Sequence, residues 1–505
     1  MNTAWMLNNI CRLMYRNEYR RFIAPQNVRR VQLGYLYSLL QKNAGTMYGR
    51  KYGFGEIRSY REFARRVPLT VYEDYEPYIG MISDGKSSVL TSEPVKLFEP
   101  TSGSSGGKKL IPYTRSLQSE FQRGIRPWLC DLYTNIPGLC GGKSYWSITP
   151  VTAGKTYTPA GIPVGFEEDS AYFGAFEQLL MRGIFAVDGS VKFTRSTEQF
   201  YHDTAVQLLR CPCLTLISVW NPTFLTILCR YIVDNAPQLL RELPECREQL
   251  AAAQNGCFEN VFCGLRLISC WADGSAAEDA KELGRLFPGV YIQPKGLLST
   301  ECFASLPLVG EEGARLSIGS HFFEFLRISD GRISTADRLE RGEYELIVTT
   351  GGGFYRYRTG DIVRVLDTEK DRPPRIRFLR RRGIASDLCG EKLTEDFVRG
   401  VCKALGIADS FCLLAPEGKG YTLYTNAASV TDYELDKALR VSYHYDYCRS
   451  LGQLRMAEVV HVNGEPERVY LERLASGGMR LGDIKPAFLS TKSGWRKYFG
   501  SEEKP

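Results

Sequence analysis

The alternation of strand-like and helical patterns constrains the fold of this chain more than any other feature. Short apolar runs at residues 144–149, 214–220, 265–271 and 290–293 alternate with stretches whose apolar residues recur at steps of three and four, such as 276–286. This alternation predicts an α/β fold, in which helices cover a sheet. Because 505 residues exceed the size of one ordinary core, we expect at least two domains.

The composition changes at residues 380–387 (RRRGIASD), where charge and glycine occur without an apolar period. Such a segment is typical of a linker. Helical patterns and a hairpin pattern follow it. We therefore expect a large N-terminal domain of mixed sheets with flanking helices over residues 1–380, a hinge at 381–387, and a small mobile C-terminal α+β lid domain over 388–505.

The charge pattern argues against nucleic acid as a partner. The formal net charge is only +7, and the one dense basic run, RIRFLRRR at 375–382, is more typical of a solvated or hinge segment. The uncharged stretch 211–229 is interrupted by Asn221 and Pro222, a good helix cap followed by a good first helical residue. It therefore predicts a buried strand and a buried helix instead of a membrane span.

Cysteine spacing and the N-terminus bear on location. Fifteen cysteines follow no regular spacing, and the first residues lack the apolar run of a secretory signal. We expect a cytoplasmic protein with free thiols. No long apolar stripe stands out, so we expect a monomer.

The glycine- and serine-rich segment TSGSSGGKK, residues 101–109, joins two strand-like segments. Successive backbone N–H groups in such a loop can form a nest that binds phosphate. It is not a Walker loop, because Lys108 stands where that pattern needs glycine. By itself the segment is either a flexible loop or a phosphate site.

Two further motifs lie downstream. In GGGFYRYRTGD (351–361), Tyr and Arg alternate as in a strand, and Asp361 stands at the expected strand end. Its carboxylate could accept hydrogen bonds from the diol of a ribose, although aspartate is also common in β-turns. In GLLSTE (296–301), Thr300 and Glu301 follow the strand predicted at 290–293. They could hold Mg²⁺ through oxygen, or they could cap a helix.

These three motifs, in this order, resemble those of the adenylate-forming enzymes. A narrower resemblance is to the acyl acid amido synthetases, the auxin-responsive Gretchen-Hagen-three family of plants and its bacterial relatives. It rests on the segments already quoted and on YGF (52–54), VPLTVYEDYEPYI (67–79), FFEF (322–325) and YELIVTTGGGFYRYRTGDIVRV (344–365).

The resemblance implies an ATP-dependent ligase. Such enzymes activate a carboxylic acid as an acyl-adenylate with ATP and Mg²⁺, and then transfer the acyl group to the amine of an amino acid. Lys485, in GDIKP, matches the catalytic lysine, although plant members usually have Gln-x-Lys-Val-Pro-Arg there. Glu301 is the implied second catalytic residue and metal ligand. The implied nucleotide-binding residues are Ser102, Gly103, Ser104, Ser105, Gly106, Gly107, Thr300, Tyr355, Tyr357, Asp361 and Lys392.

Two alternatives stay open: an adenylate-forming ligase that uses coenzyme A, and a nucleotide-binding relative without catalysis. Acyl specificity is expected from residues 117–132 and from the strand near Trp220. His321 could line the acyl pocket, but a structural role is favoured.

Overall fold

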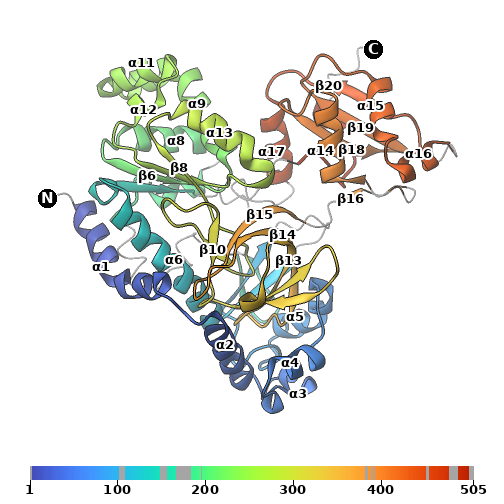
Figure 1. Ribbon diagram of the computed structural model, residues 1–505. Helices are drawn as coiled ribbons and strands as arrows, with labels where there is room; N and C mark the ends of the chain where they lie inside the picture. The colour runs from blue at the N-terminus through green and yellow to red at the C-terminus, as the bar shows by residue number, and fades with distance from the viewer. Residues whose placement is uncertain are drawn as a thin grey trace. The chain divides into compact units, whose positions relative to one another are not determined.

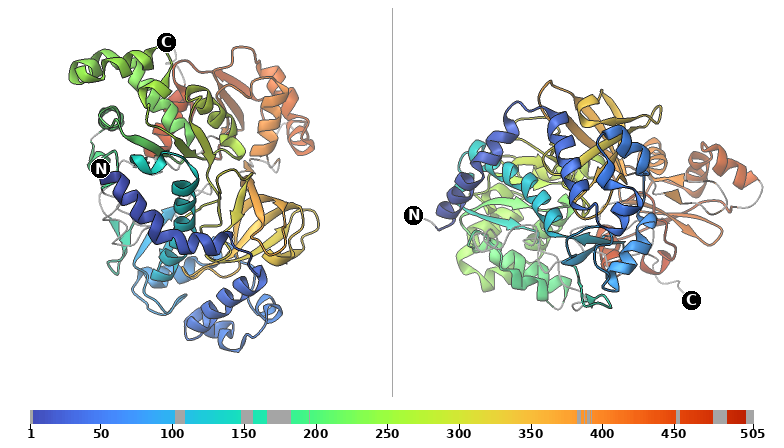
Figure 2. Two further views of the ribbon diagram at one scale, coloured as in Figure 1. Left: turned by 60° about the vertical axis from the view of Figure 1, so that its left-hand side comes forward. Right: turned by 90° about the horizontal axis from the view of Figure 1, so that it is seen from below.

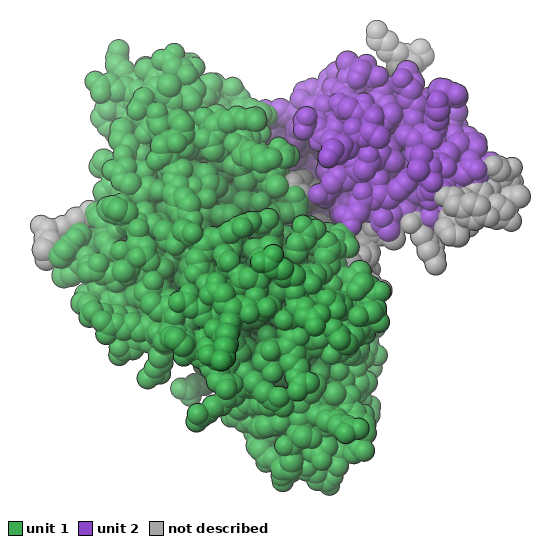
Figure 3. Space-filling view, in the orientation of Figure 1, with its two compact units in different colours: residues 1–101, 108–380 green, residues 102–107, 381–505 purple. Residues whose placement is uncertain are grey.

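The chain divides into two compact units, which Figure 3 colours separately: residues 1–101 and 108–380 form unit 1, and residues 102–107 and 381–505 form unit 2. The predicted domains and the hinge at 381–387 stay predictions. The computed structural model describes residues 3–101, 109–147, 156–165, 183–194, 196–381, 385–386, 388, 391, 393–450, 454–476 and 487–499.

Unit 1 contains a parallel sheet, and the predicted α/β fold class is confirmed. Its strands are short and apolar, and helices cover them (Figure 1), so their side chains are mostly buried, as the continuous apolar runs predict. In spatial order the strands are β3 (Lys143–Trp146), β6 (Leu214–Ser218), β7 (Leu267–Cys270) and β8 (Tyr291–Pro294). The helices of this region are α8 (Thr197–Leu209), α9 (Pro222–Asp234), α10 (Ala236–Glu242), α11 (Arg247–Gln254), α12 (Phe258–Val261) and α13 (Ala277–Leu286).

The stretch with the apolar run at 211–229 folds as expected. It forms β6 and then α9, and the Asn221 side chain caps the helix by accepting a hydrogen bond from the Thr223 N–H at 3.0 Å. Over the described part of the chain, no helix combines the length and the apolar character needed to cross a membrane.

Two further sheets of unit 1 carry the nucleotide motifs. One has the order β2-β1-β5-β4, and the other the order β12-β11-β13-β14-β15-β10-β9. The strands of the first are β1 (Leu97–Thr101), β2 (Lys109–Tyr113), β4 (Thr156–Tyr157) and β5 (Pro163–Val164). Those of the second are β9 (Ser305–Leu306), β10 (Ala314–Leu316), β11 (Phe322–Arg327), β12 (Ile333–Thr335), β13 (Gly342–Thr349), β14 (Tyr357–Asp367) and β15 (Arg375–Arg381).

The long helix α6 (Arg115–Asn135) begins at Thr114, whose hydroxyl accepts the Leu117 N–H. Residues 117, 121, 125, 128 and 132 are buried, as the helical spacing predicts. Helix α1 lies beside α6 in all views (Figures 1 and 2). The N-terminal helices are α1 (Thr3–Ile23), α2 (Val28–Lys42), α3 (Met47–Lys51), α4 (Tyr60–Arg66) and α5 (Glu76–Ser83).

The segment 354–366 differs from expectation. The sequence predicts two strands separated by a turn at Thr359–Gly360, but β14 is continuous, and Asp361 lies inside it instead of at its end. The expected turn is a bulge: Glu345 pairs with Ile362 and Ile347 with Arg358, so the intervening residues of β14 are not matched one to one. Gly360 supplies the left-handed backbone that this bulge needs, with φ of +77°.

The predicted linker contains secondary structure. Arg380 and Arg381 end β15, and β16 (Ala385–Ser386) pairs with β17 (Leu393–Thr394). The basic run is largely neutralised within unit 1. Arg375 pairs with Asp367, Arg377 with Glu312 at 2.7 Å, and Arg380 with Glu343 at 3.2 Å.

Unit 2 has a small sheet in which β18 and β19 form the predicted hairpin and β19 pairs in parallel with β20. The sequence pattern predicts one helix over residues 431–443, but the helix there ends at Leu439, and the backbone turns before a second helix begins at Tyr443. The elements are β18 (Cys412–Glu417), β19 (Gly420–Thr425), β20 (Glu458–His461), α14 (Glu395–Ala404), α15 (Asp432–Leu439), α16 (Tyr443–Ser450), α17 (Pro466–Ser476) and α18 (Arg496–Phe499).

Candidate functional site

A pocket opens at the carboxyl ends of the parallel sheet in unit 1. The space within its lining, with the solvent at its open mouth included, is about 650 Å³. Ligand sites of α/β proteins commonly form at this edge of the sheet. The lining residues are Ile125, Trp128, Trp146, Ser147, Ser218, Trp220, Lys295, Gly296, Leu298, Phe303, Ser305 and Pro307.

Both segments predicted to set acyl specificity contribute to this pocket. Ile125 and Trp128 come from α6, and Ser218 and Trp220 come from the end of β6 and the residues after it. The indole rings of Trp128 and Trp146 meet edge to face, with centroids 6.0 Å apart. The Trp128 N–H donates to Gln293 Oε1 at 3.0 Å, which fixes the plane of that ring.

A tight turn carries Thr300 and Glu301 directly beside the pocket. Leu298 and Phe303, which line the pocket, pair as a β-bridge at the base of the turn, and Ser299 and Cys302 exchange backbone hydrogen bonds above them. The Thr300 carbonyl accepts the Tyr113 hydroxyl at 2.8 Å. The predicted residues of the 296–301 motif are therefore held at the tip of an ordered loop, instead of capping a helix.

The structure brings Glu301 and Tyr357 into one buried cluster. The Glu301 side chain is only 3% exposed, and the Tyr357 hydroxyl makes a long contact of 3.5 Å to its Oε1. Burial raises the pKa of the neighbouring Cys302 thiol well above its ordinary value, and the charges of Glu301, Asp361 and Glu120 raise it further.

The backbone around Asp361 is fixed by the bulge. The Asp361 N–H donates to Thr359 Oγ1 at 3.1 Å, and that hydroxyl donates to the Leu346 carbonyl at 3.1 Å. Asp361 itself is 4% exposed. The bulge, and not a strand end, positions the carboxylate.

Tyr355 does not join this cluster through any contact that the structure gives. Its ring stacks on Tyr48, with centroids 5.2 Å apart, and its hydroxyl donates to the Leu90 carbonyl at 2.9 Å. Burial raises the pKa of this phenol well above its ordinary value. The packing makes Tyr355 part of the core, and its predicted role at the nucleotide stays a prediction.

The next residue, Arg356, has a left-handed backbone with φ of +52°, which is strained for a residue other than glycine. Its guanidinium forms a buried ion pair with Glu324 at 2.9 Å and donates to the Val67 carbonyl at 2.9 Å. This reversal interrupts the expected alternation, so Tyr355, Arg356 and Tyr357 are all buried.

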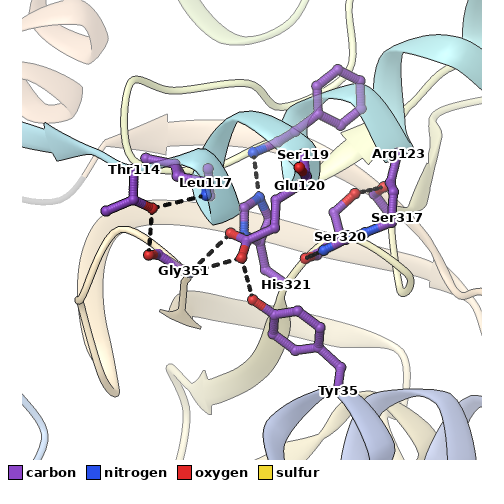
Figure 4. A network of polar contacts seen from close by, with 12 residues as sticks. Tyr35, Thr114, Leu117, Ser119, Glu120, Arg123, Ser317, Ser320, His321 and Gly351 are labelled. Atoms are coloured by element: carbon purple, nitrogen blue, oxygen red, sulfur yellow. Dashed lines mark hydrogen bonds and ion pairs between the residues drawn. The ribbon is translucent and has the colours of Figure 1, made fainter. Parts of the chain in front are cut away.

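The buried Glu120 carboxylate on α6 joins two of the motifs (Figure 4). It accepts the Gly351 N–H at 2.8 Å and 3.0 Å and the Tyr35 hydroxyl at 2.5 Å. Gly351 begins the segment that leads into Tyr357 and Asp361. The Gly351 carbonyl in turn accepts the Thr114 hydroxyl at 2.8 Å, so hydrogen bonds hold both the N–H and the carbonyl of Gly351.

His321 extends the Glu120 network to the other motif. Its Nε2 accepts the Phe303 N–H at 2.9 Å, so the ring proton belongs on Nδ1, which lies 2.7 Å from Glu120 Oε2. This last contact is a close electrostatic contact and is not counted as a hydrogen bond. His321 thus anchors the Thr300–Glu301 turn, which agrees with the structural role favoured for it; the side chain that lines the pocket there is Phe303.

The remaining predicted site residues lie outside the described residues. They are Ser102, Gly103, Ser104, Ser105, Gly106, Gly107, Lys392 and Lys485. The strands that flank the predicted phosphate loop are described: β1 and β2 form an antiparallel hairpin in which Thr101 pairs with Lys109.

Sequence reasoning missed Lys295 and Glu120. Lys295 directly follows β8, so its place at the carboxyl end of a predicted strand was the available signal. Glu120 had a weaker signal, a charged residue on the apolar face of a predicted helix.

Within the described ranges, no three His, Cys, Asp or Glu side chains gather closely enough to hold a metal ion by themselves.

Two profiles of one family match this chain: the GH3 family N-terminal domain over residues 23–266, and the GH3 family central domain over residues 315–381. The probable indole-3-acetic acid-amido synthetase GH3.4 of Oryza sativa subsp. japonica is 25% identical over 480 residues, which cover 84% of this chain and 73% of that protein. The indole-3-acetic acid-amido synthetase GH3.8 of Oryza sativa subsp. indica is 26% identical over 470 residues, which cover 81% of this chain and 75% of that protein.

A solved structure shares the fold. AtGH3.15 acyl acid amido synthetase in complex with 2,4-DB superposes with a TM-score of 0.79 at 18% identity, covering 97% of this chain and 95% of that one. The two family profiles together span more than half of the chain, and the order of its motifs predicts the same family. The chain therefore belongs to the GH3 family.

Proposed function

We propose that this protein is an ATP-dependent amido synthetase. In the first step, a carboxylate oxygen of the acid attacks the α-phosphorus of ATP; an O–P bond forms, and the bond to pyrophosphate breaks. In the second step, the amine of an amino acid attacks the acyl carbon; a C–N bond forms, AMP leaves and the amine loses a proton. The observation that carries this proposal is the buried Glu301 carboxylate, in contact with Tyr357 and beside an aromatic pocket, in a GH3 chain.

The described residues suggest how the nucleotide would be held. Asp361 would accept hydrogen bonds from the ribose hydroxyls, and Tyr357 would line the same site. The Thr300–Glu301 turn would lie at the adenine and the phosphates. The unplaced residues keep their predicted roles: the loop 102–107 at the phosphates, Lys485 as the catalytic lysine of adenylation, and Lys392 near phosphate.

The donor set fits Mg²⁺. This ion usually takes one or two carboxylates together with phosphate oxygens, and the single buried carboxylate of Glu301 meets that requirement. Glu301 would hold the ion, which when bound neutralises charge on the phosphates.

The cytoplasmic location, the monomeric state and the absence of nucleic-acid and membrane partners stay predictions of the sequence.

ATP–pyrophosphate exchange tests this proposal. With Mg²⁺ and a panel of aryl, indole and fatty acids, we expect exchange that depends on the acid added. Amino acids and coenzyme A are then compared as acceptors of the acyl group. Amide formation supports the proposal, whereas thioester formation alone would assign the chain to the coenzyme A ligases. ATP binding without exchange for any acid would favour the non-catalytic alternative.

A further inference from the structure

The pocket is apolar over most of its wall and cationic at one place. Trp128, Trp146 and Trp220 provide flat surfaces, and Leu298 and Phe303 close the side toward the Thr300–Glu301 turn. Flat aromatic walls favour a flat aromatic ligand, because ring faces and edges pack closely against one another. Lys295 is the residue of the lining that carries a positive charge.

The Lys295 ammonium is held at the sheet edge by hydroxyl groups and rings. Its Nζ donates to Ser218 Oγ at 2.8 Å and lies 3.4 Å from Ser269 Oγ, and both serines are buried, at the last residue of β6 and the last but one of β7. It also lies 5.0 Å from the ring centroid of Trp220 and 5.5 Å from that of Trp128. Attraction to two indole faces keeps the cation among the rings that would contact a ligand.

The two ends of the pocket differ chemically. The turn with Thr300 and Glu301 rises from the Leu298–Phe303 pair, so the reacting carboxylate of an acid is expected on that side. Lys295 lies on the side of the sheet, within hydrogen-bonding distance of Ser218 of β6 and Ser269 of β7. A bound acid would therefore present to Lys295 a group other than its reacting carboxylate.

We propose that the acid substrate is a flat aromatic carboxylic acid that carries a second hydrogen-bond acceptor, a hydroxyl or a second carboxylate, and that Lys295 binds this second group. This inference rests on the proposed function and deepens it, since it names the substrate class of the same site. Lys295 would act in specificity, and the chemistry of adenylation would not depend on it.

Direct binding provides the test. The affinities of benzoate, 3-hydroxybenzoate, 4-hydroxybenzoate, isophthalate and terephthalate are measured calorimetrically on the full chain, first without nucleotide. The variants are Lys295→Met, which keeps an apolar stem against the indole rings, and Lys295→Arg, which keeps the charge. Lys281→Met is the matched control, because Lys281 is an exposed lysine of α13 in the same unit. Far-UV circular dichroism checks the fold of each variant.

We expect at least one substituted acid to bind wild-type protein about tenfold or more tightly than benzoate, the gain of a hydrogen bond to a charged group. Lys295→Met should remove that preference and leave benzoate affinity within about twofold, whereas Lys295→Arg should keep part of it. An equal loss for benzoate and the substituted acids, no change in Lys295→Met, or no preference in wild-type protein would each overturn the proposal. Pyrophosphate exchange with the acids that bind tests the proposed function separately.

Discussion

At the scale of single residues, Asp361 offers the most direct test of the nucleotide site. The bulge at Thr359–Gly360 holds its backbone, so replacing the side chain should leave the strand intact. We expect Asp361→Ala to weaken ATP binding by roughly 1.5–3 kcal/mol, the contribution of hydrogen bonds to a charged group. The measurement is calorimetric titration with ATP.

The ribose assignment can be separated from a general loss of affinity by comparing ATP with 2′,3′-dideoxy-ATP. Wild-type protein should prefer ATP, and Asp361→Ala should bind the two nucleotides alike. Asp330→Ala, at an exposed turn of the same sheet, is the control. Unchanged ATP affinity in Asp361→Ala would show that the assignment is wrong.

At the scale of elements, Glu120 joins α6, the start of β11 and the segment that leads into β14. Glu120→Gln keeps the shape of the side chain, but its amide adds an N–H where the Gly351 N–H and the Tyr35 hydroxyl need an acceptor. A buried donor left without an acceptor costs about 1–3 kcal/mol. We expect a lower melting temperature and, because both motifs shift, a higher KM for ATP in pyrophosphate exchange.

Tyr35→Phe is the matched variant for Glu120. It removes one hydrogen bond to the same carboxylate while leaving both contacts to the Gly351 N–H. It should lose stability with little change in the KM for ATP. If both variants raise this KM equally, the network supports the fold and does not position the motifs.

In unit 2, Asp436 on α15 is the carboxylate with the strongest set of donors. Burial raises its pKa, but hydrogen bonds from Arg449, the Ala457 N–H, Tyr445 and Arg440 lower it more, to about 2 from the ordinary 3.8. The stabilisation is therefore complete above about pH 4 and is lost as the pH falls toward 2. We expect Asp436→Asn to cost roughly 2 kcal/mol at pH 7 and progressively less below pH 4.

Urea unfolding of the full chain at pH 7, 5, 4 and 3, followed by circular dichroism, measures this effect. Asp446→Asn is the control, because Asp446 is about half exposed and bonds only Arg440 among the same arginines. A difference between Asp436→Asn and wild type that does not shrink below pH 4 would contradict the linkage argument.

At the scale of the whole molecule, local patterns predict the elements better than the site. The spacing of Leu117, Phe121 and Ile125 and the cap at Asn221 depend on neighbours in sequence, and the structure confirms the helices that they predict. The left-handed Arg356 depends on Glu324, Ala64 and Val67, which are remote in sequence. An alternating Tyr-Arg pattern contains no information about such remote contacts, so it predicts a regular strand.

The site could be predicted where residues form a motif. Thr300, Glu301, Tyr357 and Asp361 belong to such patterns, and the structure places the Tyr357 hydroxyl 3.5 Å from Glu301 Oε1, while the roles of all four stay predictions. Lys295 stands alone in sequence, and its contacts with Ser218 and Trp128 exist only once three strand ends and a helix have assembled. What the sequence lacks is the information about which strand ends lie side by side at the edge of the sheet.

The two half-reactions make different demands on the protein as a whole. Adenylation develops negative charge on phosphate, which a lysine can stabilise, whereas amide formation needs room for an amine at the acyl carbon. If Lys485 serves only the first step, Lys485→Ala should slow pyrophosphate exchange by about 100-fold or more, as the loss of one charge-stabilising donor does. Amide formation from a supplied acyl-adenylate should then change little.

Single-turnover measurements of each step, with Lys492→Ala as an exposed-lysine control from the same unit, separate these effects. A selective loss of adenylation would also support the predicted lid. A residue that is required in one step and dispensable in the other is what a domain that turns between the two steps would show. Equal losses in both steps would remove the special role of Lys485 and leave the hinge at 381–387 without this support.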